Sequence, residues 1–359
     1  MGPDMRRSLS HHERVRLALE HRETDRVPIA MVCSGVNPPA KRELERFLRD
    51  TRGIGVDEYF EPILDIKTVE PRYTGPPLGP RTDYWGVIRR PVSYGAGEYD
   101  EIEHYPLGSA ATIDDIARHR WPSVEWFDYS VIREQVRHIN STEEFCLMGH
   151  NFNPFETSWY MRGLERSFMD MALAPDMIRS ILEKVTEFLV AHAERILQAG
   201  DGRIDLMFTA DDIGGQNGLL MSLSMWEEFI KPCHVKINTL IHQYGARVIY
   251  HSDGAIMEAV EGLIDMGIDV LQPLQFDARG MDPHALKELY GVCLCFQGGI
   301  SVQKTLPFGT AEEVRQETLD RIRVLGKGGG YVLGPTHAIQ AGTPAENILA
   351  MFDTALGGR

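Results

Sequence analysis

Apolar and polar positions alternate along the chain in blocks that predict strands and helices in turn. Short runs of mostly apolar, β-branched residues are typical of buried parallel strands, and the longer segments between them have helical spacing. Strands are expected to begin near residues 27, 62, 145, 205, 247, 269, 292 and 331. Helices are expected at 11–20, 41–49, 162–173, 175–198, 224–244, 255–266, 283–289, 311–325 and 345–355. Eight strands with intervening helices predict an α/β fold, a (β/α)8 TIM barrel, as one domain over residues 1–359.

The alternation is interrupted from about residue 69 to 127, where Pro, Gly, Tyr and Trp are frequent. Short alternating pieces at 84–88 and 98–104 predict a β-hairpin-containing insertion after the second strand. We expect the insertion to pack beside the barrel mouth and to help bind substrate or partner, because Tyr84, Trp85 and Tyr94 would be costly to leave in solvent. The alternative is a surface elaboration with no role in chemistry.

The charge, the cysteine content and the apolar segments of the chain restrict the binding partners and the cellular compartment that we expect. The chain has 37 basic and 52 acidic residues, a formal net charge of −15, and no basic run that could follow a phosphate backbone, which argues against nucleic acid and anionic membrane. Five cysteines, an odd number and mostly in apolar runs, fit a reducing compartment. No apolar segment approaches a membrane span, and residues 1–10 lack the apolar core of a signal peptide. We therefore expect a cytoplasmic protein, and a homodimer is compatible with the sequence.

The central stretch is the segment 247–254, which reads Arg-Val-Ile-Tyr-His-Ser-Asp-Gly. An apolar run followed at once by polar residues predicts a buried strand that delivers His251 and Asp253 to its carboxyl end, where α/β enzymes keep their chemistry. The alternative is a capping turn, in which Ser252 or Asp253 closes the amino end of the next helix.

Polar side chains follow nearly every predicted strand, more often than chance placement would give. They are Cys33 and Ser34; His150, Asn151, Asn153 and Glu156; Asp211 and Asp212; His251 and Asp253; Gln272 and Gln275; Gln297; and Thr336, His337 and Gln340. From these we predict catalytic roles for Asp211, Asp212 and His251, and, together with the insertion, substrate binding by Asn151, Glu156, Trp85, Gln272 and Gln297. Of the adjacent aspartates, we expect one to face the pocket and the other to fix its loop, with neither in a metal shell.

Three of these residues are potential metal ligands, namely His251, Asp253 and His337. The first two alternate on one extended segment and the third follows the last strand, so they could converge at the barrel mouth. Two histidines and one carboxylate leave zinc an open fourth position, which is the catalytic rather than the structural pattern.

Seven sets of stretches carry a resemblance that covers nearly the whole chain. They are 12–15 with 25–28, 83–86, 155–156 with 162–163, 211–214, 251–254, 297–300, and 334–337 with 343–347. Together they resemble the uroporphyrinogen decarboxylase superfamily, and within it the corrinoid-dependent methyltransferase branch. The resemblance implies a (β/α)8 barrel. Decarboxylases of this fold carry an arginine-rich segment after the first strand to hold an acidic porphyrin, whereas residues 31–37 contain no arginine here; a lyase acting on a tetrapyrrole or another carboxylate is therefore the second alternative.

Methyltransferases of the branch, such as those that move methyl groups between methylcobalamin and coenzyme M, bind zinc through a His-x-Cys pair and a later Cys. In this chain His251 matches the first ligand, while Asp253 and His337 stand at the two Cys positions. A zinc ion (Zn2+) with fewer thiolates suits the polarisation of an oxygen, as in the demethylation of an ether or alcohol.

The chain lacks the Asp-x-His-x-x-Gly corrinoid-binding motif, since the closest match, 282–287, ends in Lys. The resemblance thus implies a zinc-dependent methyltransferase that passes a methyl group from a small O-methylated substrate to a corrinoid (cobalamin) carried by a separate protein. A third, non-catalytic interpretation is a corrinoid-binding or partner-docking barrel that has lost its metal site.

Overall fold

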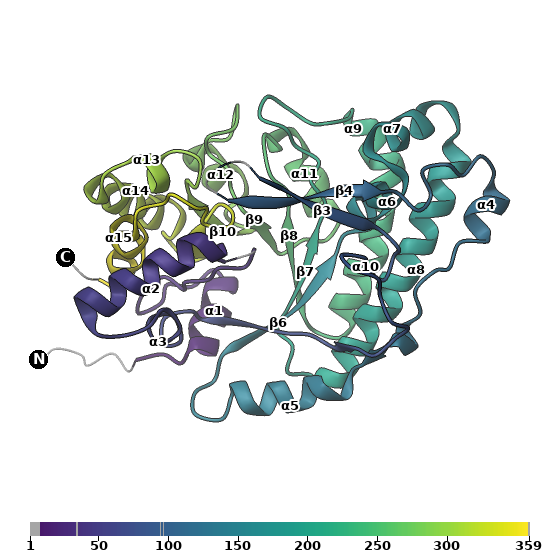
Figure 1. The fold of residues 1–359 in the computed structure, drawn as a ribbon. Coiled ribbons are helices and arrows are strands. Elements are labelled where there is room, and N and C mark those ends of the chain that lie inside the picture. The colour runs from purple at the N-terminus through teal and green to yellow at the C-terminus, as the bar shows by residue number, and fades with distance from the viewer. Residues whose placement is uncertain (1–7, 34, 94, 96, 358–359) are drawn as a thin grey trace, which may run out of the picture.

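A computed structural model describes residues 8–33, 35–93, 95 and 97–357, and its centre is a curled parallel sheet of seven strands (Figure 1). The strands lie in the order β1-β6-β7-β8-β9-β10-β11. Their bounds are β1 (Ile66–Val69), β6 (Cys146–Phe152), β7 (Leu206–Ala210), β8 (Arg247–His251), β9 (Val270–Gln272), β10 (Cys295–Ile300) and β11 (Tyr331–Pro335). Neighbours follow chain order, as right-handed βα crossovers in a barrel require.

The eighth predicted strand, near residue 27, is reduced to a single parallel bridge between Ile29 and Leu333 of β11. On the other side of this segment, the Asp65 amide donates to the Ile29 carbonyl (2.8 Å) just before β1. The segment therefore lies between the two edge strands and joins them, which confirms the TIM-barrel prediction. Pro28 has no N–H to donate, which explains why a full ladder does not form here.

Helix α1 (His11–Leu19) closes the amino-terminal end of the barrel. It begins at a Ser10–Glu13 capping box, and its Val15 and Leu19 pack in one buried cluster with strand residues such as Ile249. The remaining helices surround the sheet (Figure 1). They are α2 (Pro38–Arg52), α3 (Val56–Phe60), α5 (Ser130–Ile139), α6 (Pro154–Arg162), α7 (Leu164–Leu173), α8 (Pro175–Gly200), α9 (Leu223–Met225), α10 (Lys231–Gln243), α11 (Val260–Asp265), α12 (Pro283–Tyr290), α13 (Thr305–Phe308), α14 (Ala311–Leu325) and α15 (Ala345–Ala355).

Three expected helices differ from those in the structure. The helix expected at 162–173 begins only at Leu164, because Gly163, with a φ of +93°, ends α6 and starts α7. A π-helical turn (η2, Trp226–Ile230) separates α9 from α10, and the helix expected at 255–266 is a 3-10 turn (η3, Met257–Ala259) followed by the short α11. No helix among the described residues is long and apolar enough to cross a membrane.

The insertion contains the expected hairpin, formed by β3 (Ile88–Ser93) and β4 (Glu98–His104), together with β2 (Arg72–Tyr73), α4 (Ile113–Ala117), η1 (Val124–Trp126) and β5 (Phe127–Asp128). The Arg89 guanidinium lies 5.3 Å from the centre of the Tyr160 ring on α6. A cavity of about 590 Å³ lies between Tyr99 and Pro91 of the hairpin and Pro38 at the start of α2. Because α2 and α6 both follow strands at their carboxyl ends, the hairpin lies at the barrel mouth, while its role in binding stays a prediction.

The aromatic side chains of the insertion pack mostly against α8. Trp85 is 6% exposed, and its ring lies 5.0 Å from that of Phe188 and 6.4 Å from that of Trp121. Tyr84 contacts the same Phe188 ring, and Tyr94 lies outside the described residues. Trp85 therefore packs in the hydrophobic core between the insertion and the barrel. The structure does not place it among the polar side chains of the mouth, where its predicted role in substrate binding would require it.

Candidate metal centre and active site

The carboxyl ends of β7, β8 and β9 meet in register. Ala210 pairs with His251, and His251 pairs with Gln272, so the residues that follow β7 and β8 are neighbours at the mouth. This is the position at which TIM-barrel enzymes build their active sites.

The loop after β8 is bonded to the loop after β7. The Ile213 amide donates to Ser252 Oγ (3.0 Å), and the Asp253 amide donates to Asp212 Oδ1 (2.8 Å). At Gly254 (φ +89°) a Cβ would come within 2.6 Å of the neighbouring loop's backbone, so only glycine allows this approach. Neither η3 nor α11 has a side-chain cap, so the capping alternative for Ser252 and Asp253 is wrong.

The two adjacent aspartates have different surroundings. Asp211 is fully buried, accepts hydrogen bonds from the amides of Phe155 (2.9 Å) and Glu156 (2.7 Å), and lies 2.7 Å from Nε2 of the buried His234. Asp211 thus fixes the amino end of α6. Because its side chain is fully buried and cannot reach a substrate, the structure does not support the catalytic role that we predicted for it. Asp212 faces the site, with Oδ1 3.5 Å from His251 Nε2.

The His251 ring is held in one orientation by Gln272. The Gln272 Oε1 atom is a hydrogen-bond acceptor for His251 Nδ1, which assigns the ring proton to Nδ1 and leaves a lone pair on Nε2. Nε2 faces Asp212 at 3.5 Å and Asp253 at 3.8 Å. Gln272 is 1% exposed, so the structure gives it the task of orienting His251 where we had predicted substrate binding.

Among the residues that the structure describes, two groups of side chains at the mouth have ligand atoms that all lie within 4.8 Å of one another, and both include His251. One group adds Cys33 and His337, and the other adds Asp212 and Asp253. The predicted ligand set of His251, Asp253 and His337 is therefore divided between the two groups, and Asp212, expected outside the metal shell, belongs to one of them. The sequence placed Cys33 only at the end of a predicted strand. Local spacing could not connect it with His337, which lies 304 positions further along the chain.

The chemistry of these donors fits a zinc ion. Asp253 Oδ1 is buried and has no hydrogen-bond partner among the residues that the structure describes, and burial raises the pKa of this carboxyl group. A buried polar atom without a hydrogen-bond partner is uncommon in native proteins, and a role in binding an ion or a ligand is one explanation for it. Imidazole, thiolate and carboxylate are the side chains that bind zinc in proteins.

The His337 ring is oriented by the backbone. The Ala338 amide donates to Nδ1 (2.7 Å), which assigns the proton of the neutral ring to Nε2, 3.7 Å from Cys33 Sγ. Coordination through Nε2 would cost this amide hydrogen bond, about 1 kcal/mol. That cost is small beside the roughly 10–16 kcal/mol with which structural zinc binds zinc-finger peptides.

Glu156, in the first turn of α6, supplies an acid beside the donor groups. Asn153 Nδ2 donates to its Oε2. Burial, and then the charges of Asp212 and Asp211, raise the pKa of Glu156 to about 7. A carboxyl group with a pKa near neutrality is protonated in a substantial fraction of molecules at neutral pH, which suits a general acid.

The remaining predicted substrate residues are placed less directly. Gln297 is fully buried, its Nε2 donates to the Ala30 carbonyl (3.2 Å), and its Oε1 has no partner among the described residues. The side chain of Asn151 lies outside the described part of the structure, as does Ser34. The barrel mouth thus contains the two donor groups around His251 and the acid Glu156, whose pKa is raised. Near them lie two oxygens that lack hydrogen-bond partners among the described residues, one on Gln297 and one on Asp253.

Comparison with known proteins agrees with this architecture. Residues 90–356 match the family model described as Uroporphyrinogen decarboxylase (URO-D). The uroporphyrinogen decarboxylase of Anaeromyxobacter sp. (strain Fw109-5) is 24% identical over 233 residues, 63% of either chain. Uroporphyrinogen decarboxylase 2, chloroplastic, of Oryza sativa subsp. japonica is 22% identical over 269 residues, 71% of this chain and 63% of that one. The chain thus matches about 63% of the length of these curated relatives.

A methyltransferase from Methanosarcina mazei has a similar structure, with a TM-score of 0.67 and 19% identity over 97% of this chain and 99% of that chain. At this identity the likeness shows the fold, which extends over nearly the full length of both proteins. The chain belongs to the uroporphyrinogen decarboxylase (URO-D) family.

Proposed function

We propose that the protein is a zinc-dependent methyltransferase that moves a methyl group from a small O-methylated compound to a corrinoid carried by a separate protein. The observation that carries the proposal is the pair of donor groups that share His251 at the barrel mouth. The fold shared with the Methanosarcina mazei methyltransferase and the absence of arginine from residues 31–37 support it over a decarboxylase. The retained donors also speak against a barrel that has lost its metal site.

His251 would hold the metal together with Cys33 and His337 or with Asp212 and Asp253. When bound, zinc would supply a Lewis acid to the oxygen that carries the methyl group.

The other steps depend on the chain's own residues. Gln272 keeps the lone pair of His251 Nε2 directed into the site, and Asp211 holds α6 so that Glu156 stays beside it. Glu156 can hold a proton at neutral pH and donate it to the oxygen as the methyl carbon leaves. The C–O bond would break as the methyl carbon passes to the cobalt(I) corrinoid of the partner, which would serve as the methyl acceptor, and the alcohol or phenol would depart with the proton from Glu156.

A transfer assay with free cobalamin tests this function without the partner. Zinc-loaded protein is incubated with chemically reduced cob(I)alamin and a series of donors such as methanol and methoxybenzoates, and methylcobalamin is followed by absorbance. We expect methylcobalamin with at least one O-methyl donor and none with His251→Ala. Release of CO2 from a uroporphyrinogen, without methyl transfer from any donor, would overturn the proposal in favour of a lyase.

A further inference from the structure

Cys33 and His337 are brought together by backbone register. Parallel bridges join Ile29 with Leu333 and Val36 with Ile339. Cys33 and His337 each lie four residues beyond the first bridge, and the second bridge follows three residues after Cys33 and two after His337, so both residues lie between the same two bridges. Their side chains then meet, with Cys33 Sγ 3.7 Å from His337 Nε2.

The separation of these atoms fits a shared ion. With Zn–S near 2.3 Å and Zn–N near 2.0–2.1 Å, a tetrahedral site places sulfur and nitrogen about 3.6 Å apart. The Nε2 atom of His251 completes the group, and Gln272 already leaves its lone pair available. The three side chains come from the segment after the Ile29 bridge, the end of β8 and the loop after β11, and their ligand atoms all lie within 4.8 Å of one another.

Distance alone does not separate the two donor groups, since Asp212 and Asp253 lie 3.5 and 3.8 Å from His251 Nε2. The two groups do differ in the chemical type of their donor atoms. A thiolate and two imidazoles are the nitrogen and sulfur ligands that zinc favours, whereas oxygen-rich sites suit magnesium, calcium and manganese. In addition, Asp212 Oδ1 already accepts the hydrogen bond of the Asp253 amide (2.8 Å).

We infer that Cys33 is a thiolate ligand of the metal, in a Cys33–His251–His337 triad with an open fourth position. The inference rests on the proposed function, because it specifies the ligands of the same site. It leaves Asp212 and Asp253 outside the coordination shell and beside the open position. There Asp253 Oδ1, which has no hydrogen-bond partner among the described residues, accepts a hydrogen bond from the bound substrate, which favours methyl donors that carry a hydroxyl or an ammonium group near the O-methyl group.

Cobalt(II) in place of zinc tests the thiolate directly. The full chain is stripped with a chelator and titrated with Co2+. We expect one equivalent to give the visible bands of a tetrahedral site together with an intense near-ultraviolet sulfur-to-cobalt charge-transfer band. Cys33→Ser should abolish the charge-transfer band and weaken binding, whereas Asp253→Asn should keep it. Cys293→Ser, at an exposed cysteine, is the matched control and should leave every band unchanged.

A second measurement needs no substitution and so holds even if Cys33→Ser folds poorly. The wild-type protein is treated with iodoacetamide with and without Zn2+, and alkylation is located by mass spectrometry. We expect zinc to protect Cys33 and not Cys293. Protein that binds Co2+ without the charge-transfer band, or zinc that leaves Cys33 alkylation unchanged, would overturn the inference and assign the metal to Asp212, His251 and Asp253 without touching the proposed function. Wild-type protein that binds neither metal would overturn both.

Discussion

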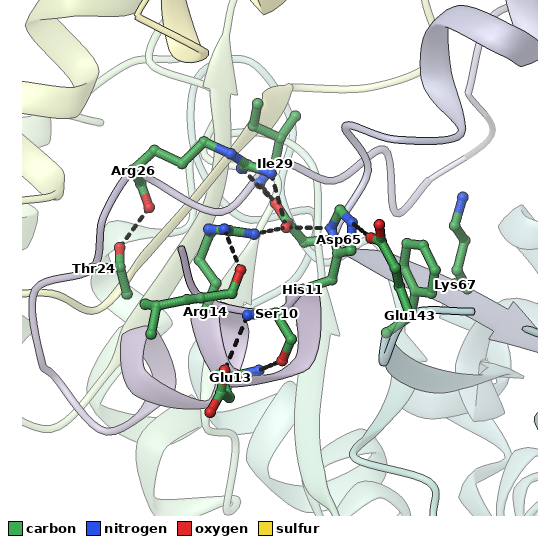
Figure 2. A network of polar contacts seen from close by, with 12 residues as sticks. Ser10, His11, Glu13, Arg14, Thr24, Arg26, Ile29, Asp65, Lys67 and Glu143 are labelled. Carbon is green, nitrogen blue, oxygen red and sulfur yellow. Dashed lines mark hydrogen bonds and ion pairs between the residues drawn. The ribbon is translucent and has the colours of Figure 1, made fainter. Parts of the chain in front are cut away.

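Two clusters of acidic and histidine side chains lie at opposite ends of the barrel, and they differ in how far their carboxylates are supplied with hydrogen-bond partners. At the amino-terminal end the fully buried Asp65 accepts from His11 Nδ1 (2.8 Å), from the Arg14 and Arg26 guanidinium groups (2.7 Å each) and from the Ile29 amide (2.7 Å), as Figure 2 shows. At the mouth, Asp253 Oδ1 has no hydrogen-bond partner among the described residues, and its nearest charged neighbour is His251 Nε2 at 3.8 Å.

The pKa values of two buried acids differ accordingly. Burial alone would raise the pKa of Asp65, but the hydrogen bonds from His11 and Arg26 outweigh it and leave the pKa below its ordinary value. Burial also raises the pKa of Glu156, and the charges of Asp212 and Asp211 add to that effect. The amino-terminal cluster thus stabilises charged side chains for the fold, while the mouth keeps polar groups without hydrogen-bond partners that a ligand can use.

The largest expected effect is on stability, from Asp65→Asn. The change leaves the buried Arg14 and the neighbouring Arg26 without their shared carboxylate, and breaking a buried ion pair typically costs about 3–5 kcal/mol. The free energy of unfolding, measured in urea, should fall by that amount. Asp100→Asn is the matched control, because its pair with Arg81 is about half exposed and exposed pairs contribute roughly 0–1 kcal/mol. Equal losses in the two variants would contradict the structural role of the Asp65 cluster.

The next effect comes from His234→Ala, which leaves the buried Asp211 without its imidazole partner. A buried acceptor that loses its donor costs about 1–3 kcal/mol. Urea unfolding should show this loss. His242→Ala, on the same helix α10, is the control, since His242 is 42% exposed in its pair with Asp269 and the loss should stay below about 1 kcal/mol. A loss for His234→Ala no larger than that for His242→Ala would show that His234 does not stabilise the buried Asp211.

Gln272→Ala should weaken the metal site while leaving the fold almost intact. The variant removes the acceptor that fixes the His251 tautomer, and loss of such a supporting group typically costs 10–100-fold in metal affinity. Zinc affinity is measured by competition with a chromogenic chelator. Gln340→Ala, whose side chain contacts Asn37 at the surface, should bind zinc like the wild type. Unchanged affinity in Gln272→Ala would mean that His251 does not coordinate through Nε2.

The smallest effect is on the pH dependence of stability. A carboxyl group whose pKa is raised on folding stabilises the protein below its unfolded pKa, and this contribution is lost as pH rises through the folded pKa. For Glu156 this window runs from the ordinary pKa of 4.5 to the folded pKa of about 7. As pH rises between those two values, the free energy of unfolding measured in urea should therefore fall less for Glu156→Gln than for the wild type. Asp65 has the opposite sign, since its contribution is lost only as pH falls below 3.8 through the lowered folded pKa. Parallel curves for Glu156→Gln and wild type would contradict the raised pKa.

Much of the fold was predictable because periodicity reports burial along a segment. The strands near Leu206, Arg247 and Tyr331 and the capped helix at His11 follow from local patterns. The closing segment at Ile29 was harder to predict, because Pro28 reduces it to a bridge and only contacts with distant residues hold it in place.

Prediction of the site was less complete for the same reason. Polar residues after each strand pointed to the mouth, and His251 lies at its centre. The roles of Gln272 and Asp211, however, depend on hydrogen bonds to residues 21 and 23 positions away, and the contact between Cys33 and His337 spans 304 positions. Local spacing cannot show such contacts, although the register of the first and last strands could have suggested the cysteine.

Zinc content tests the central claim, that the donors around His251 form a metal centre while the Asp65 cluster serves the fold. Wild-type protein, His251→Ala and Asp65→Asn are purified without chelator, and zinc and urea stability are measured on the same samples. We expect about one zinc per chain in the wild type and in folded Asp65→Asn, which is the less stable protein, and almost none in the stably folded His251→Ala. Zinc retained by His251→Ala, or absent from the wild type after incubation with Zn2+, would contradict the account.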